Sequence, residues 1–178
     1  MIVINLCGGP CAGKSTVMAG VFAKMKEMGL NVEMASEYVK DCVYSGDMYA
    51  FHDQVFTFAQ QLKKLRQYNG KVDFVVTDAP LIMNHVYGRG EAKEFYDFVD
   101  EETKKYNNIY IILHRGRIKF NKMGRYHGED RANDIQMQVE ALAHKNMSSV
   151  QHDVLEVFTD LHPVPIIVKY AIDVSKEG

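Results

Sequence analysis

The sequence lacks tryptophan altogether and contains only three cysteines and four prolines among its 178 residues. The cysteines, Cys7, Cys11 and Cys42, are odd in number and do not have the spacing of a metal site, which predicts reduced thiols and a cytoplasmic location. No segment approaches the roughly 20 apolar residues that span a bilayer, and the apolar N-terminal run is too short for a secretory signal. We therefore expect neither a disulfide-stabilised extracellular domain nor a membrane protein.

An excess of charge of either sign is also missing. Lysine and arginine total 21 against 23 for aspartate and glutamate, so a formal net charge of −2 creates no overall field that draws the protein to nucleic acid or membranes. The 47% hydrophobic and 25% charged residues are typical of a globular domain with a substantial core. Because internal repeats, low-complexity segments and linkers are absent as well, we treat residues 1–178 as one domain.

One segment carries a specific chemical signal. Residues 8–15 read GGPCAGKS, which fits the G-x-x-x-x-G-K-[ST] pattern of a phosphate-binding loop. The segment follows the β-branched apolar run Met1–Leu6 and precedes Thr16–Lys26, whose apolar residues have helical spacing. A strand, a glycine-rich loop and a helix in this order are the context that the pattern requires.

The residue types in this loop suit the binding of a nucleoside triphosphate. Glycines at positions 8, 9 and 13 let the backbone adopt conformations closed to other residues, so that successive N–H groups form a nest for phosphate oxygens at a helix N-terminus. Lys14 would bridge the outer phosphates and the hydroxyl of Ser15 would bind Mg²⁺. The nucleotide-binding residues are then expected to be Gly8, Gly9, Pro10, Cys11, Ala12, Gly13, Lys14, Ser15 and Thr16.

Strands and helices alternate along the rest of the chain. The sequence predicts strands at 1–6, 32–35, 72–77, 108–113 and 163–168, and helices at 16–26, 48–68, up to 87, 91–105 and from about 133 toward 161. This alternation predicts an α/β fold with a parallel sheet covered on both faces. Ligands of such sheets bind beyond the carboxyl ends of the strands, where the phosphate-binding loop also lies.

Two carboxylates follow predicted strands at that edge. Asp78 ends the third strand and would hold Mg²⁺ through a water molecule or orient the acceptor, although a turn aspartate before Pro80 remains an alternative. Glu37 ends the second strand and could accept the proton of an attacking hydroxyl, unless it is a surface residue at the start of a helix. On the helix at 48–68, Gln54 and Gln61 are candidates for hydrogen bonds to a nucleobase.

Residues 115–131 interrupt the strand and helix pattern with a polar, glycine-containing segment. It carries six lysines and arginines against two acidic residues. Phosphoryl transfer spreads negative charge over the equatorial oxygens, so a basic lid that closes over the phosphates is an expected catalytic part. With Lys14, the candidate catalytic cations are Arg115, Arg125 and Arg131, while a solvated charged loop remains the alternative reading.

Together these segments resemble the P-loop nucleoside and nucleotide kinases, nearest the ribosylnicotinamide-kinase-like group with the NadR kinase domain and phage P-loop kinases. The resemblance rests on GGPCAGKST, on SEY after the second strand, on the run from Phe51 to Leu62, on TDAP at 77–80 and on the arginine-bearing lid. It implies a three-layer fold with five parallel strands in the order 2-3-1-4-5, ATP as phosphoryl donor and Mg²⁺ as cofactor. Thymidylate and deoxynucleoside kinases carry an arginine just after the strand-three aspartate, whereas this chain has Ala79 and Pro80.

Several functions are compatible with these residues. The first is an ATP-dependent kinase that phosphorylates a hydroxyl of a small nucleoside-like molecule, with Glu37 as base. A phage-type kinase acting on a hydroxymethylated base in DNA is a variant that the basic lid favours and the net acidic charge disfavours. A nucleoside monophosphate kinase is a closer rival, but a phosphate acceptor needs no general base, so Glu37 favours a hydroxyl. The oligomeric state is left open, with a homodimer as one option.

A regulatory GTPase would need the motifs N-K-x-D and D-x-x-G. Asn121-Lys122-Met123-Gly124 lacks the aspartate of the first motif and Asp78-Ala79-Pro80-Leu81 lacks the glycine of the second, which disfavours a switch protein. A motor or AAA assembly usually requires a further domain that 178 residues do not hold. The chemistry of the sequence therefore favours a phosphotransferase.

Overall fold

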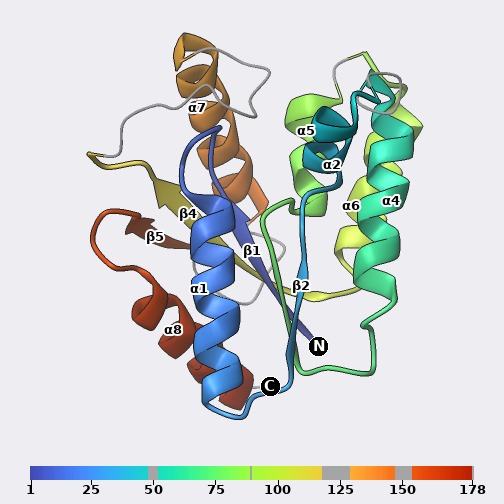
Figure 1. Cartoon of the computed structure of the whole chain (residues 1–178). Helices are drawn as coiled ribbons and strands as arrows, with labels where there is room; N and C mark the ends of the chain where they lie inside the picture. Colours follow the sequence, from blue (N-terminus) through green and yellow to red (C-terminus); the bar gives the residue numbers. More distant parts are fainter. Residues whose placement is uncertain (48–51, 89, 118–128, 147–153, 178) are drawn as a thin grey trace.

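The computed structural model describes residues 1–47, 52–88, 90–117, 129–146 and 154–177 (Figure 1). One parallel sheet has the strand order β2-β3-β1-β4-β5, as the resemblance implied. The strands are β1 (Ile2–Cys7), β2 (Val32–Ala35), β3 (Phe74–Thr77), β4 (Asn107–His114) and β5 (Leu155–Phe158). The helices are α1 (Lys14–Glu27), α2 (Tyr38–Ser45), α4 (Gln54–Arg66), α5 (Asn84–Tyr87), α6 (Lys93–Thr103), α7 (Glu129–Asn146) and α8 (Val164–Glu177), with a 3₁₀ turn η1 at Leu81–Met83.

Helices cover both faces of the sheet, which confirms the predicted three-layer α/β fold (Figure 1). Successive residues of β1 point to opposite faces because side chains alternate along a strand. Ile4 and Leu6 pack in the core formed with α1 and α8. Val3 packs on the other face with residues of α4 and α6, and Cys7 packs there with residues of α5 and α7.

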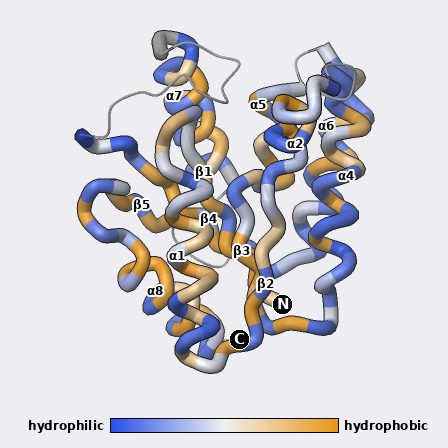
Figure 2. The backbone as a smooth tube through the Cα atoms, in the orientation of Figure 1, coloured by the Kyte–Doolittle hydropathy of each residue, from blue (hydrophilic) through white to orange (hydrophobic). Residues whose placement is uncertain are grey.

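The central strands are the most hydrophobic and the most deeply buried part of the chain. From Ile109 to Leu113 in β4, every residue is at most 2% exposed. In Figure 2 the outer helices alternate between hydrophobic and hydrophilic residues along their length, as expected for helices with one face on the sheet. Among the described residues, no helix has the length and hydropathy that crossing a bilayer would require.

The last strand does not lie where the sequence predicted it. The segment 163–168 was expected to be a strand because of its β-branched residues, but Val164–Glu177 is helix α8, and the fifth strand is Leu155–Phe158. Pro163 and Pro165 are compatible with this helix because prolines are tolerated in its first turn, where the N–H groups have no intrahelical acceptor. The helix expected from 133 toward 161 likewise ends at Asn146. Only Val157 is buried in β5, so this edge strand has a weak hydrophobic signal.

A second difference lies after β2. The sequence offered a helix that starts at Glu37 only as an alternative, and the structure has α2 there, with Cys42 as its one buried residue. Tyr38, Val39, Cys42 and Val43 have helical spacing, but a pattern of eight residues is too short to identify a helix by itself. Within the predicted helix 48–68, α4 begins at Gln54, where the Asp53 side chain accepts a hydrogen bond from the Phe56 N–H at 2.8 Å and so caps the helix. Residues 48–51 lie outside the described part of the chain.

The strand register brings three chain segments to one edge of the sheet. Asn5 of β1 and Ala35 of β2 both pair with Thr77 of β3, which is the last residue of that strand. The residues that follow these positions are therefore neighbours at the carboxyl ends of adjacent parallel strands. They are the phosphate-binding loop after β1, Glu37 after β2 and Asp78 after β3.

Candidate active site

The phosphate-binding loop wraps around the N-terminus of α1. Gly13 is the N-cap of this helix with a φ of 81°, a left-handed conformation that favours glycine, so the prediction for this position is confirmed. No side chain caps the helix and its first turn contains no acidic residue. The positive end of α1 is thus left available for an anion such as phosphate.

Gly8 and Gly9 are glycines for a different reason from the one predicted. Neither has the positive φ that only glycine readily adopts. A Cβ on Gly8 would lie 3.0 Å from the Leu113 carbonyl oxygen, and one on Gly9 would lie 2.7 Å from the Ala132 carbonyl oxygen. These positions therefore lack side chains because β4 and α7 pack directly against the loop backbone. Cys11, in contrast, adopts a φ of 66° although it carries a side chain.

The Lys14 side chain folds back over the loop. Its Nζ donates to the carbonyl oxygen of Gly8 at 2.7 Å and to that of Gly9 at 3.0 Å. The ammonium group is therefore held beside the amides of the loop, where the outer phosphates of a bound nucleotide would lie. The neighbouring Cys7 is no nucleophile, because burial raises the pKa of its thiol to about 12 despite the opposing effect of Lys14.

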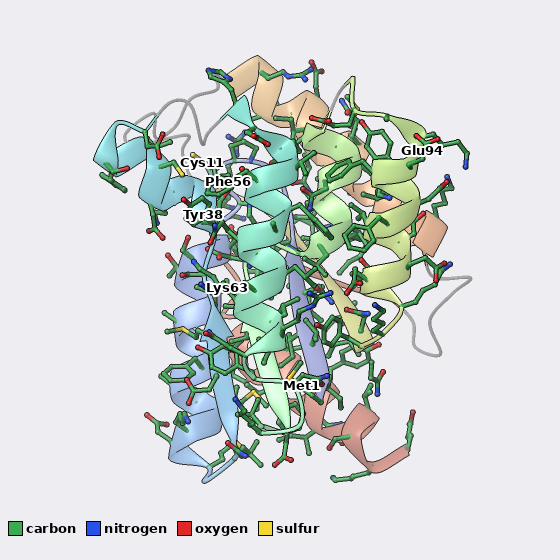
Figure 3. The ribbon with its side chains drawn as sticks, turned by 90° about the vertical axis from the view of Figure 1, so that its right-hand side faces the viewer. Met1, Cys11, Tyr38, Phe56, Lys63 and Glu94 are labelled. Atoms are coloured by element: carbon green, nitrogen blue, oxygen red, sulfur yellow. The ribbon has the colours of Figure 1, made fainter. Side chains whose placement is uncertain are left out.

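A cavity of about 360 Å³ opens next to the loop and is bounded by α2, α4 and the η1–α5 segment. Lys14, Glu37 and Asp78 line its end at the phosphate-binding loop, and polar side chains also line the rest of the cavity: Gln54, Gln61 and Asn84. Figure 3 shows Cys11, Tyr38 and Phe56 gathered at this end of the molecule, with Met1 at the opposite end. The site thus lies at the edge of the sheet that the strand order predicts.

The carboxylate of Asp78 is linked by a hydrogen bond to the backbone of Glu37. Asp78 is 3% exposed, and its Oδ1 accepts the backbone N–H of Glu37 at 2.9 Å. Glu37 is the N-cap of α2, so this bond fixes the start of the helix as well as the residue itself. Asp78 therefore holds Glu37 in place, a role that the sequence alone did not reveal.

Gln61 contributes a buried acceptor without a partner. Its Nε2 lies 3.4 Å from the Ala35 carbonyl oxygen and 3.3 Å from Thr77 Oγ1. A carbonyl oxygen cannot donate, so the amide nitrogen must face Ala35 and Oε1 must face the other way. Within the described residues this Oε1 has no hydrogen-bond partner, although Gln61 is only 4% exposed. A buried acceptor of this kind calls for a donor, and the residue lines the cavity.

Gln54 is held by a second amide. Its Nε2 donates to Asn84 Oδ1 at 2.6 Å, while Asn84 Nδ2 donates to the Leu81 carbonyl oxygen at 2.6 Å. Asn84 is 6% exposed and was not predicted as a site residue, because an isolated asparagine in a short helix has no distinctive sequence pattern. The pair fixes the amide of Gln54 at the cavity wall.

Two of the predicted arginines, Arg115 and Arg131, are not among the described residues that line this cavity. Arg115 follows β4 and its Nη2 lies 3.4 Å from Asn133 Oδ1 of α7. Arg131 lies inside α7, which begins at Glu129, and its Nη1 is 4.0 Å from Asp134 Oδ2. The segment predicted as a lid at 115–131 thus overlaps the first turn of a helix. Arg125 lies outside the described residues, and a catalytic role of any of the three stays a prediction.

The oxygen donors at the site suit Mg²⁺ better than a softer metal. Ser15 lies in the first turn of α1 and carries a hydroxyl, Asp78 follows the strand adjacent to β1 and carries a carboxylate, and hard cations prefer such oxygen ligands. In the described part of the chain, no group of three or more histidine, cysteine or acidic residues has the arrangement of a metal-binding cluster. The residues present therefore fit a cation shared with bound phosphates rather than one held in an all-protein cage.

A protein-family model described as an AAA domain matches residues 3–161. The chain belongs to this family. The length of the chain disfavours an AAA assembly with a further domain. The match concerns the domain alone, so the assembly state stays a prediction. A search of curated proteins found no match.

Solved structures share the fold. Deoxyadenosine kinase from M. mycoides with bound dATP has a TM-score of 0.55 and 18% identity, with 97% of this chain and 98% of that chain covered. Shikimate kinase from Aquifex aeolicus vf5 has a TM-score of 0.52 and 15% identity, with 99% and 96% covered. At these identities the likeness establishes a P-loop kinase-like fold, and it does not single out the NadR or phage subgroup.

Proposed function

We propose that the protein is an ATP-dependent kinase that transfers the γ-phosphoryl group of ATP to a hydroxyl of a nucleoside-like acceptor. The observation that carries the proposal is the convergence of Lys14, Glu37 and Asp78 on one cavity, next to an uncapped helix N-terminus. The fold shared with deoxyadenosine kinase and shikimate kinase supports the reaction class.

Each residue at the loop end of the cavity has a role in this reaction. The amides of the loop and the ammonium of Lys14 would bind the phosphates and balance the charge that develops during transfer. Glu37 would accept the proton of the attacking hydroxyl, and Asp78 holds the Glu37 backbone in place. Ser15 and Asp78 would hold Mg²⁺, which neutralises phosphate charge when bound.

The polar wall of the cavity supports a nucleoside-like acceptor. The buried Oε1 of Gln61 requires an N–H or O–H donor, and the amide of Gln54 is fixed by Asn84. The amine and amide edges of a nucleobase offer such donors in a plane, and Tyr38, Met83 and Tyr87 are among the residues that line the cavity and could contact the faces of the base. The wild-type site should therefore discriminate against analogues that lack the donor.

The charges that line the cavity favour a hydroxyl over a phosphate as the acceptor group. Away from Lys14, the described lining residues include one further lysine, Lys40, but three carboxylates, Glu37, Asp78 and Glu91. An acceptor that carries its own phosphate would meet these carboxylates without an arginine clamp among the described lining residues. We therefore prefer a nucleoside to a nucleoside monophosphate.

The direct test is a panel of acceptors with γ-labelled ATP and Mg²⁺. The panel contains nucleosides, nucleoside monophosphates and duplex DNA with a hydroxymethylated base, and the Lys14→Ala variant is the negative control for each. Transfer to a nucleoside hydroxyl that disappears in Lys14→Ala is the expected result. Label that enters only monophosphates or only DNA would replace the proposed acceptor, and the absence of transfer to any acceptor would contradict the kinase proposal.

A further inference from the structure

The peptide group between Gly8 and Gly9 is held at both of its ends. Its carbonyl oxygen, that of Gly8, accepts from Lys14 Nζ at 2.7 Å, and its N–H, that of Gly9, donates to Gln136 Oε1 at 2.5 Å. Because the C=O and N–H of a trans peptide point in opposite directions, Lys14 and Gln136 bind opposite edges of the same peptide group. The orientation of one peptide therefore links Gln136 of α7 to Lys14 of α1.

The orientation of a peptide group between two glycines is only weakly restrained by the backbone itself. Rotation of the plane changes ψ of Gly8 and φ of Gly9, and glycine tolerates both changes because it has no Cβ. The packing described above excludes side chains at these two positions. Outside contacts are therefore needed to prevent the peptide from turning, and Gln136 supplies the one at the N–H end.

Gln136 is itself anchored. Its Nε2 donates to the Leu113 carbonyl oxygen at 3.3 Å and to Glu140 Oε1 at 2.8 Å. Glu140 Oε1 lies 3.4 Å from His114 Nδ1, whose ring binds Glu156 through Nε2 at 2.9 Å. The amide nitrogen must face these two acceptors, so Oε1 must face Gly9. The side chain thus connects the end of β4, the helix α7 and the loop.

We infer that Gln136 is a positioning residue that keeps the Gly8–Gly9 peptide in the orientation that Lys14 needs for nucleotide binding. If the plane turned, Lys14 would face an N–H in place of a carbonyl oxygen, and a cation is repelled by a donor. The ammonium would lose one of its two backbone acceptors and its fixed place beside the loop. This inference rests on the nucleotide-binding part of the proposed function and is independent of the acceptor.

The key variant is Gln136→Met in the full chain, with ATP and Mg²⁺ as the ligand and no acceptor present. We expect ATP binding to weaken about 10-fold or more. The reason is that a turned peptide would remove the hydrogen bond from the Lys14 ammonium to Gly8, and a hydrogen bond to a charged group contributes a factor of that order. The amide proton of Gly9, followed by NMR in the nucleotide-free protein, should exchange with solvent faster. Met137→Glu is the matched control, because Met137 is the next residue of α7 and is 62% exposed, so both measurements should stay unchanged.

A charge exchange gives a sharper result. Gln136→Glu alone retains an acceptor for Gly9 but places a second carboxylate beside Glu140, so ATP binding should weaken. Combining it with Glu140→Gln restores a donor between the two positions, and affinity should return to within about threefold of wild type. The midpoint of thermal unfolding is recorded for every variant. A variant that binds ATP weakly but unfolds at the wild-type midpoint has kept its fold and has lost only the orientation of the Gly8–Gly9 peptide.

The inference would be wrong if Gln136→Met bound ATP within twofold of wild type, whether or not Gly9 exchange became faster. It would also be wrong if the exchange of amide and carboxylate failed to recover affinity in a folded protein. Failure of wild type itself to bind ATP would instead overturn the nucleotide-binding premise, and a wrong choice of acceptor would leave these measurements intact.

Discussion

The hydrogen bond between Asp78 and Glu37 allows the charge of Asp78 to be separated from its positioning role. In Asp78→Asn the side chain keeps an oxygen that can accept the Glu37 N–H, so the charge is lost but the contact remains. In Asp78→Ala both are lost. The difference between the two variants therefore isolates the hydrogen bond.

The expected sizes follow from the geometry. Asp78 is 3% exposed, so Asp78→Ala leaves a backbone N–H without its acceptor at the start of α2, which costs roughly 1–3 kcal/mol of stability. Asp78→Asn should lose much less stability and should raise the Mg²⁺ concentration needed for half-maximal turnover. Glu37→Gln keeps shape and backbone contact, and loss of a general base should lower kcat by about 10²–10⁴-fold with ATP affinity nearly unchanged.

Three measurements on each variant separate these roles. Denaturant unfolding gives the stability difference, a Mg²⁺ titration of γ-phosphoryl transfer gives the metal dependence, and steady-state kinetics give kcat and KM. Equal stability of Asp78→Asn and Asp78→Ala would show that the bond to Glu37 does not position α2. Defects of Glu37→Gln and Asp78→Asn that are equal and repaired by excess Mg²⁺ would refute the assignment of Glu37 as base.

Three further outcomes are expected. Lys14→Ala should abolish phosphoryl transfer while the thermal unfolding midpoint stays within a few degrees, and wild-type turnover in this variant would contradict the kinase proposal. Arg115→Ala should lower kcat by about 10³-fold, more than it raises KM for ATP, whereas a change within threefold would mark Arg115 as an ordinary surface cation. Burial alone would raise the pKa of Glu102, but hydrogen bonds from Lys105 and Arg66 lower it below the usual range. Its stabilisation is therefore present above the unfolded pKa of about 4.3 and lost as pH falls through the folded pKa, so Glu102→Gln should cost about 2 kcal/mol at pH 7 in a urea titration and less as the pH falls below the unfolded pKa.

Local patterns in the sequence determined the phosphate-binding half of the site. The motif, the strand before it and the helix after it are contiguous, so the position of Lys14 and the left-handed Gly13 follow from residues 1–27 alone. Glu37 and Asp78 were identified because each follows a short apolar strand, and parallel strands place such residues at one edge. The strand order came from the resemblance, and the structure confirms it.

Other features depended on contacts between distant segments. The strand at 155–158 has one buried residue and so a weak hydrophobic pattern, and the helix at 38–45 is too short for its spacing to identify it. The segment 164–168 is rich in β-branched residues, which predicts a strand. In the structure Ile167, Val168 and Ala171 are buried against α1 at helical spacing, and this packing outweighs the local preference.

The tertiary structure added a residue that the sequence had not indicated. Gln136 meets Gly9 across 127 positions of sequence, and nothing in its immediate neighbours distinguishes it from other glutamines in helices. Gln61 was already a candidate for a hydrogen bond to a nucleobase, but only the packing of α4 on β2 and β3 makes its Oε1 a buried acceptor that has no partner among the described residues. A local motif specifies the residues that would contact phosphate, because consecutive residues of the loop form that nest. The residues that orient the nest and the acceptor come from distant segments, which only the packing of helices on a shared sheet brings together.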